Sequence, residues 1–342
     1  MPLVSICIPT FNRARVLDRS LGLLLRNIES HGVGGKFQIC ISDNGSTDDT
    51  QEVIQRQKHV CEVRSARLPE NRGFGENLKS ALGLATGKWI VVFGDDDFVS
   101  DETIPLLLQY GQAAEPLVIF NTGPGEHYAT GGLAGCGERR LNGCAEIIRK
   151  LGISQLSSIT NFMANRERFM TVADRMDPRS VFPHTQALTA LAARSPVLFV
   201  DKPLLIAEGH YRDWNVLIPF LWGIDMARVL SESASRGDIP YVLRMKCYAR
   251  LMRHLPKAIL LERNQNVLPA FGNPYRSTEL RNIAKAYSGS RLAMISGMAL
   301  CLAFRYMPMS LALNLIRRAG GTLELPPRGT IAATTLDADL GQ

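Results

Sequence analysis

The first hundred residues alternate between short apolar runs and longer stretches that can form helices. The runs over positions 3–8, 37–42, 60–66 and 89–93 are predicted to be strands, and the run at 89–93 is apolar enough to be buried on both faces. Each run is followed by turn residues and then by a segment with helical character. Strands joined in this way form a parallel sheet with helices on both faces. The sequence therefore predicts an α/β fold with a Rossmann-like, mostly parallel sheet.

The run at 89–93 ends in Gly94, and three consecutive aspartates follow, Asp95, Asp96 and Asp97. Adjacent like charges repel one another unless a cation or wide exposure to solvent offsets them. Open α/β sheets bind ligands at the carboxyl ends of their strands, and divalent cations prefer oxygen ligands there while keeping positions for substrate phosphates. The triplet therefore indicates a metal and phosphate site. A solvated acidic turn that precedes a helix is the alternative.

Polar residues also follow the first two strands. Asp43 comes after the second strand, at the edge where the triplet is expected, and can hydrogen-bond a ribose or a base. The alternative for Asp43 is an Asx-turn, in which its side chain bonds to the backbone that follows. Asn12 is expected to cap the first helix, and Ser46 or Thr47 the second.

Four motifs occur in a fixed order along this region, and together they are far more specific than any one alone. They are Pro9-Thr10-Phe11-Asn12-Arg13, Asp43-Asn44-Gly45-Ser46-Thr47-Asp48, Asn71-Arg72-Gly73, and Gly87-Lys88-Trp89 followed by the acidic triplet. They resemble the motifs of the family 2 glycosyltransferases, closely over residues 3 to about 125 and loosely beyond. The resemblance implies a GT-A fold, an inverting transfer from a nucleotide-sugar donor, and Mg²⁺ or Mn²⁺ as cofactor.

The resemblance also implies roles for individual residues. Asp96 would bind the metal ion, and Asp43 would meet the base of the nucleotide. Gly94 stands where the family has the first Asp of an Asp-x-Asp motif, so Asp95 or Asp97 would compensate for its contact with the ribose. The segment from His210 to Arg212 resembles the family's loop that closes on the diphosphate. The residues implied in substrate binding are Pro9, Thr10, Asn12, Arg13, Asp43, Asn71, Gly73, Asp95, His210 and Arg212.

The general base of the family is the Asp of a Glu-Asp pair that opens a helix, and by the resemblance this pair falls on Pro183-His184. A neutral histidine accepts a proton near physiological pH, and a helix N-terminus favours the neutral form. His184 is therefore a candidate catalytic residue, together with Asp97. The alternative is a structural His184 that fills a polar corner. Substitutes for the base are Asp177, Asp201 and Asp213.

The last third of the chain is basic and helical in pattern. Its apolar stretches are shorter than the roughly 20 residues that a membrane-spanning helix needs. We expect a GT-A domain over 1–212, with a nucleotide-sugar-binding half (1–121) and an acceptor half (122–212), then a basic helical region over 213–319 and a disordered tail over 320–342. The basic helices fit a peripheral contact with an anionic membrane surface. Core helices with solvated arginines are the alternative.

The composition limits the class of protein and the cellular compartment that we expect. The formal net charge is +7, 46% of the residues are hydrophobic, and the seven cysteines include no CxxC pair. These features favour a globular protein with reduced thiols in the cytoplasm over a disulfide-framed or zinc protein. The start of the chain shows no secretory signal pattern. The basic charge comes without a nucleic-acid-binding motif, so we expect no nucleic-acid partner.

The leading hypothesis is a glycosyltransferase that serves bacterial surface polysaccharide synthesis, with a glycan or lipid-linked saccharide as acceptor, at the inner face of the plasma membrane. A catalytically inactive nucleotide-sugar-binding or scaffold protein is the alternative, because the first Asp of the metal motif and the carboxylate base are both absent. A dehydrogenase is disfavoured because Gly73-Phe74-Gly75 lacks the third glycine of a dinucleotide fingerprint. A nucleotidyltransferase would need a basic, glycine-rich loop after the first strand, and Pro9-Thr10-Phe11-Asn12 does not supply one.

Overall fold

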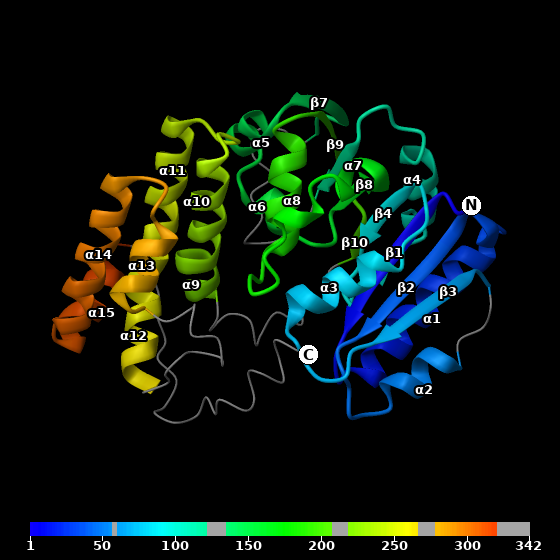
Figure 1. Ribbon diagram of the computed structural model, residues 1–342, viewed down its shortest axis with the longest axis horizontal. Coiled ribbons are helices and arrows are strands. Elements are labelled where there is room, and N and C mark those ends of the chain that lie inside the picture. The colour runs from blue at the N-terminus through cyan, green and yellow to red at the C-terminus, as the bar shows by residue number, and fades with distance from the viewer. Residues whose placement is uncertain (57–59, 122–134, 207–217, 266–277, 320–342) are drawn as a thin grey trace. The chain divides into compact units, whose positions relative to one another are not determined.

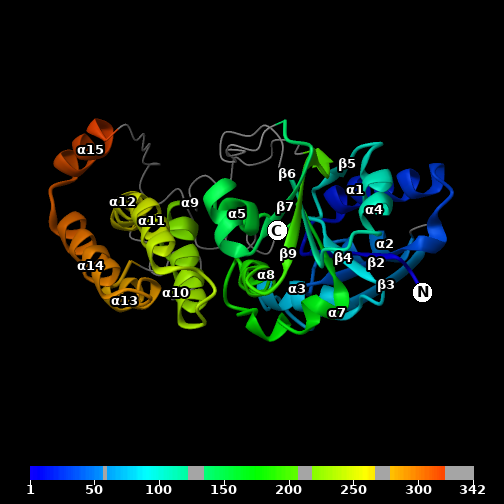
Figure 2. The same cartoon turned by 90° about the horizontal axis from the view of Figure 1, so that it is seen from above.

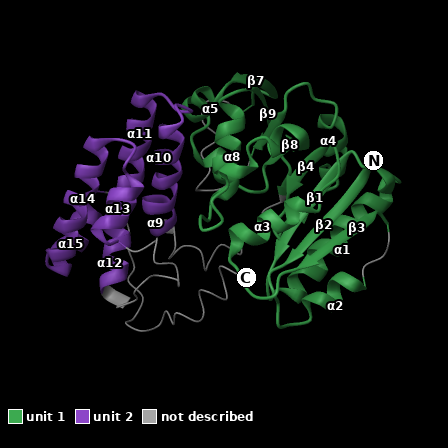
Figure 3. Cartoon of the chain, in the orientation of Figure 1, with its two compact units in different colours: residues 1–209, 341–342 green, residues 210–340 purple. Residues whose placement is uncertain are grey.

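A computed structural model of the chain describes residues 1–56, 60–121, 135–206, 218–265 and 278–319. The chain divides into two units, the first formed by Met1–Gly209 and the second by His210–Leu340, which Figure 3 shows in different colours. The first unit contains the sheet, and the described part of the second unit is helical (Figure 1).

The central sheet of the first unit has eight strands. These are β1 (Val4–Thr10), β2 (Phe37–Asp43), β3 (Glu62–Arg67), β4 (Trp89–Val92), β6 (Leu117–Asn121), β7 (Glu138–Asn142), β8 (Phe162–Asn165) and β9 (Pro196–Pro203). Their order across the sheet is β3-β2-β1-β4-β8-β6-β9-β7. A second, two-stranded sheet pairs β5 (Phe98–Val99) with β10 (Leu205–Ile206) in antiparallel orientation.

Helices cover both faces of the central sheet. They are α1 (Ala14–Ser30), α2 (Thr50–Gln55), α3 (Phe74–Gly83), α4 (Thr103–Tyr110), α5 (Cys144–Lys150), α6 (Ser154–Ser157), α7 (Arg166–Met170) and α8 (Pro183–Ala192). Figure 2 shows α1 and α4 on one face and α3 and α7 on the other. Alternate residues of β1, such as Ile6 and Ile8, pack with Leu17 and Leu21 of α1 in the main hydrophobic core. This core fixes the strand ends that form the site.

The predicted α/β fold is confirmed, and the sheet is mixed. β3, β2, β1 and β4 run parallel as predicted, whereas β8 is antiparallel to both β4 and β6. Residues 154–157 form α6, and β8 begins at Phe162. β7 was not predicted. It is an edge strand with exposed Glu138, Arg139 and Arg140, so it lacks the apolar run by which the other strands were recognised.

The described part of the second unit is helical, as expected for this region. Its helices are α9 (Ile218–Phe220), α10 (Ala227–Ser235), α11 (Tyr241–Leu251), α12 (Leu255–Gln265), α13 (Leu280–Ala286), α14 (Arg291–Tyr306) and α15 (Met309–Arg318), with a π-helical segment over Leu221–Met226. A 3₁₀ turn at Met252–His254 separates α11 from α12. Pro256 accounts for the division, because proline cannot donate the backbone bond that a continuous helix requires there.

Candidate active site

The ends of β1, β2 and β4 meet at one edge of the sheet, and Thr10 joins them. Thr10 is the register partner of Asp43, the last residue of β2. Its hydroxyl donates to Asp95 Oδ2 at 2.8 Å, just beyond β4. Its carbonyl oxygen accepts bonds from the Asn44 amide at 2.9 Å and from Asn77 Nδ2 at 3.0 Å. The two acidic motifs of the sequence therefore lie at the same edge, as predicted.

Arg13 bridges two carboxylates of the acidic triplet. Its Nη1 atom lies 3.0 Å from Asp95 Oδ1 and 2.9 Å from Asp96 Oδ2. The Asp95 side chain is 8% exposed and the Asp96 side chain 39%, so the bridge reaches from the interior to the surface. Ser20 of α1 donates to the Asp95 carbonyl oxygen at 2.6 Å and holds the turn from behind. The triplet thus has one internal cation and one carboxylate that faces solvent.

Negative charge remains in excess at this edge. The pKa of Asp95 is raised to about 6, because burial and the neighbouring charge of Asp96 raise it more than Arg13 and the hydrogen bond from Thr10 lower it. Burial, together with the charge of Asp96, raises the pKa of Asp97 to about 8, although the Gly94 amide donates a hydrogen bond to its carboxylate. Carboxylates that hold protons so readily are the groups that an added cation would stabilise.

Gly94 allows the turn to fold tightly. A Cβ atom at this position would lie 2.9 Å from Asp96 Oδ1 and 3.0 Å from Asp97 Oδ2. A side chain here would therefore press on both carboxylates. The departure from the family motif at Gly94 is accompanied by direct packing of Asp96 and Asp97 against the backbone.

The donor set fits a divalent cation that is shared with a substrate. The described residues contain no group of three or more His, Cys, Asp or Glu side chains arranged to hold a metal alone. Mg²⁺ sites that include substrate phosphates need only one or two carboxylates from the protein, because phosphates and water supply the other ligands. Asp96 meets this requirement, since it is the partly exposed carboxylate of the bridged pair.

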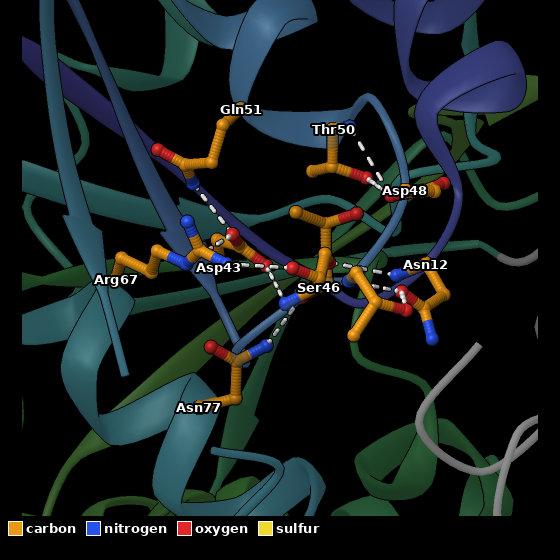
Figure 4. A network of polar contacts seen from close by, with 10 residues as sticks. Asn12, Asp43, Ser46, Asp48, Thr50, Gln51, Arg67 and Asn77 are labelled. Atoms are coloured by element: carbon orange, nitrogen blue, oxygen red, sulfur yellow. Dashed lines mark hydrogen bonds and ion pairs between the residues drawn. The ribbon is translucent and has the colours of Figure 1, made fainter. Parts of the chain in front are cut away.

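The loops after β1 and β2 are tied together by side chains from each (Figure 4). The Asn12 amide donates to Ser46 Oγ at 2.8 Å, and Asn12 Oδ1 accepts from the Thr47 amide at 2.8 Å. Asn12 therefore does not cap α1 as expected, because its side chain is used between the loops. Asp48 accepts the Ala14 amide at the start of α1 and also the Thr50 amide at the start of α2. The caps predicted at Asn12 and at Ser46 or Thr47 are therefore wrong, because Asp48 accepts the amide at the start of both helices.

Asp43 is buried, and both of its carboxylate oxygens have protein partners (Figure 4). Oδ1 accepts from the Ser46 amide at 2.9 Å, while Oδ2 accepts from Gln51 Nε2 at 2.5 Å and lies 3.6 Å from Arg67 Nε. The bond to Ser46 is the local turn that was considered as the alternative for Asp43. The contact with a nucleotide base remains a prediction.

Gly45 provides a stability test of this loop. Its φ is +80°, and a Cβ atom would lie 2.8 Å from the Glu70 backbone in the loop after β3. We expect Gly45→Ala to lower the free energy of unfolding by roughly 2–4 kcal/mol, because it adds both left-handed strain and overlap. Gly83→Ala is the matched control, since nothing lies within 4 Å of that Cβ position and its φ is not positive. The free energy of unfolding of both variants would be measured by urea denaturation. Equal decreases in the two variants would contradict this account.

Two further predicted residues lie in the loop before α3. Asn71 Oδ1 accepts from Asn44 Nδ2 at 2.8 Å and from the Gly73 amide at 2.9 Å. Gly73, with φ of +83°, immediately precedes α3. Asn44 thus joins this loop to the end of β2, next to Asp43. Pro9 lies in β1 opposite Ser42 and is buried in the sheet.

His184 occupies the second position of α8 and is 1% exposed. Its Nε2 lies 2.8 Å from the Ser157 carbonyl oxygen, to which it donates, and its ring stacks on Phe162. Nδ1 has no hydrogen-bond partner among the described residues. This geometry is that of a neutral, buried imidazole; its role as a base remains a prediction.

The burial of His184 predicts a pH dependence of stability. Burial lowers the pKa of His184 to about 4. The unfolded chain, with a histidine pKa near 6.5, binds more protons between these values, so stability is lost as the pH falls from about 6.5 towards 4. The parent should therefore lose about 2 kcal/mol of unfolding free energy through His184 between pH 7.5 and 5. His184→Gln, whose amide can still donate to the Ser157 carbonyl, should not show this part of the loss. Urea denaturation at the two pH values tests this; equal losses in parent and variant would contradict it.

The remaining candidates lie elsewhere or outside the described residues. Asp177 accepts from Arg179 Nε at 2.9 Å, and Asp201 accepts from Asn121 Nδ2 at 2.6 Å. His210, Arg212 and Asp213 lie outside the described residues.

Several polar residues of the site were not predicted. They are Ser20, which holds the acidic turn, and Asn44, Gln51, Arg67 and Asn77, which surround Thr10 and Asp43. Each contributes through a partner on another element. Motifs read along the chain could not identify these contacts.

This sheet, with its carboxylate-rich edge, has the architecture of the GT-A glycosyltransferases. The solved TarS fragment 1–349 of S. aureus in complex with UDP-GlcNAc matches 95% of this chain and 93% of its own, with a TM-score of 0.61 and 15% identity. The mannosyltransferase PcManGT of Pyrobaculum calidifontis, in complex with GDP-Man and Mn²⁺, matches 93% of this chain and 80% of its own, with a TM-score of 0.51 and 16% identity. At these identities the likeness concerns the fold.

Residues 5–128, which carry the site, match the model of the family described as Glycosyl transferase family 2. Among curated proteins, the abequosyltransferase RfbV of Salmonella typhimurium is 34% identical over 110 residues, which is 32% of each chain. A Campylobacter jejuni protein named GalNAc(5)-diNAcBac-PP-undecaprenol beta-1,3-glucosyltransferase is 28% identical over 32% of this chain and 34% of its own. The match therefore spans about a third of the length of these relatives.

Proposed function

We propose that the chain is a glycosyltransferase that moves a sugar from a nucleotide-sugar donor to a hydroxyl group of a glycan or a lipid-linked saccharide. The observation that carries the proposal is the junction at Thr10, which is paired with Asp43 and bonded to Asp95 within a family 2 domain. A nucleoside at Asp43 and a diphosphate at the triplet would lie along one edge of the sheet. This is the place where open α/β sheets bind nucleotides.

The acidic triplet would bind the donor through Mg²⁺ or Mn²⁺ held by Asp96. Such an ion, when bound, supplies positive charge that stabilises the diphosphate as it leaves. Asp95 is held by Thr10 and Arg13, so its part is to fix the turn that presents Asp96. Arg13 lies beside Asp96 and can offer its remaining N–H groups to the diphosphate.

The transfer would proceed with inversion at the anomeric carbon. The acceptor oxygen forms its bond to that carbon on the side opposite the nucleoside diphosphate, whose bond to the carbon breaks. The hydroxyl proton passes to a base, for which His184 and Asp97 are the candidates. Of the two, Asp97 adjoins the proposed metal ligand and, with a pKa of about 8, changes its protonation state near physiological pH.

The relatives and the charge support a proposal for the acceptor class and the compartment. One of the relatives is named as an abequosyltransferase and another as a GalNAc(5)-diNAcBac-PP-undecaprenol beta-1,3-glucosyltransferase. By analogy with them we propose a role in bacterial surface polysaccharide synthesis, in the cytoplasm at the inner face of the plasma membrane. Within the described ranges, no helix combines the length and hydrophobicity that a membrane crossing requires.

A donor panel tests the function. Thermal unfolding of the full chain would be measured with each common nucleoside diphosphate sugar, with and without Mn²⁺. A donor that binds should raise the midpoint only when Mn²⁺ is present, because ligands of the folded state stabilise it. Release of nucleoside diphosphate from that donor, with candidate acceptors, then measures turnover. Binding without turnover of any donor would instead support the nucleotide-sugar-binding scaffold.

A further inference from the structure

Helix α14 in the second unit exposes apolar side chains along one side. Leu292, Ile295, Leu302 and Tyr306 are 61%, 62%, 41% and 77% exposed. Their spacing of three, seven and four residues places them on the same side of the helix. The opposite side of α14 is buried against α12 and α13. The exposed side chains therefore do not contribute to the hydrophobic core of the second unit.

Helix α15 also exposes apolar side chains. Leu311 and Leu315 are 48% and 39% exposed, whereas Ala312 and Ile316 are buried in a cluster with Leu260 of α12. The outer face, defined as Leu292, Ile295, Leu302, Tyr306, Leu311 and Leu315, therefore spans two consecutive helices.

Arg263 of α12 fixes the connection between the two helices. Its Nη1 donates to the carbonyl oxygens of Phe304 at 2.7 Å and Met307 at 2.8 Å. These two bonds hold the C-terminal end of α14, and the turn that leads into α15, on α12.

Positive charge accompanies the outer face. Residues 291–319 contain four arginines and no Asp or Glu. Arg305 is used internally, since its guanidinium donates to the carbonyl and hydroxyl oxygens of Thr278. Arg291, Arg317 and Arg318 are exposed, and no acidic side chain of the described residues forms an ion pair with them. The surface therefore combines exposed leucines, a tyrosine and uncompensated positive charge.

We propose that the outer face rests in the headgroup region of an anionic lipid bilayer. Apolar side chains flanked by arginines and an interfacial tyrosine match such a surface in both hydrophobicity and charge. A second copy of the chain fits less well, because residues 291–319 of both copies would bring arginines and no acidic residue to the contact. This contact does not depend on the proposed enzymatic activity.

Vesicle flotation of the full chain tests the proposal. We expect the chain to bind vesicles of phosphatidylcholine that contain about 30% of the anionic lipid phosphatidylglycerol. We expect little binding to vesicles of phosphatidylcholine alone. Raising the salt from about 0.1 to 1 M should weaken binding at least tenfold, because the Debye length falls from about 10 to 3 Å. The pair Arg317→Gln and Arg318→Gln should weaken it about fivefold for each arginine removed.

The apolar contribution is tested by Ile295→Asp combined with Leu302→Asp, which should reduce binding at least tenfold. Met170→Asp is the matched control, because Met170 is 47% exposed but lies in α7 of the first unit. Thermal unfolding of each variant checks that it is folded. The proposal is overturned if the parent does not bind anionic vesicles, or if Met170→Asp weakens binding as much as the α14 pair. It is also overturned if light scattering shows a dimer that the α14 substitutions dissociate.

Discussion

Replacing Asp96 with alanine is expected to lower donor turnover by at least about a hundredfold, the usual size of effect when one group that stabilises developing charge is removed. The same change should abolish the part of the donor-induced thermal shift that depends on Mn²⁺. The reason is that Asp96 is the exposed carboxylate of the bridged pair, and Asp95 already accepts bonds from Thr10 and Arg13. Both readouts are needed, since turnover alone would not separate metal binding from catalysis.

Two variants serve as controls for Asp96→Ala. Asp96→Asn keeps the shape and an acceptor for Arg13 but removes the charge, so it should lose most of the Mn²⁺ dependence. Asp101→Ala removes an exposed carboxylate just beyond β5 and should leave both turnover and the Mn²⁺ shift unchanged. Full activity of Asp96→Ala with Mn²⁺ present would exclude the metal role of this residue.

Arg13→Ala is expected to lower the stability of the fold by leaving the carboxylates of the site without their counterion. It removes the cation that lies within 3.0 Å of both Asp95 and Asp96, and it leaves Asp95 buried without that partner. Breaking a buried pair costs about 3–5 kcal/mol; because Asp96 is partly exposed, we expect a loss of roughly 2–3 kcal/mol in the free energy of unfolding. Saturating Mn²⁺ should restore part of this loss in Arg13→Ala, since a second cation would then offset the carboxylates.

Arg56→Ala is the matched control for Arg13→Ala. Arg56 pairs with Asp18 at 3.1 Å, but the two side chains are 57% and 46% exposed. An ion pair of this kind contributes about 0–1 kcal/mol. Urea denaturation of the two variants at neutral pH would show a clear difference in free energy. Equal losses would mean that Arg13 is an ordinary surface residue and that the triplet is neutralised in another way.

The framework of the site could be predicted because its signals are local. The run Trp89 to Phe93 is apolar on both faces and ends directly in the triplet, so its strand and the position of the carboxylates follow from the sequence around them. Asp43 ends β2 for the same reason, and the parallel order of β2, β1 and β4 brings the two motifs to one edge. The polar edge strand β7 carries no comparable signal.

The details of the site depend on contacts between residues far apart in the chain. Asn12 bonds to Thr47, which lies 35 positions away, and this contact overrides its local tendency to cap α1. Arg13 reaches Asp95 and Asp96 across 82 and 83 positions, so its role as their counterion appears only in the folded chain. His184 likewise opens α8 as expected, but its burial beside Phe162 depends on β8.

The most direct test of the metal role is the position of Mn²⁺ in crystals grown with the nucleoside diphosphate of the donor that the thermal-shift panel selects. We predict an anomalous peak at direct coordination distance from the Asp96 carboxylate, roughly 2.0–2.2 Å, with diphosphate oxygens completing the site. A bound nucleotide whose Mn²⁺ lies away from Asp96, or binds nowhere at saturating concentration, would contradict the account.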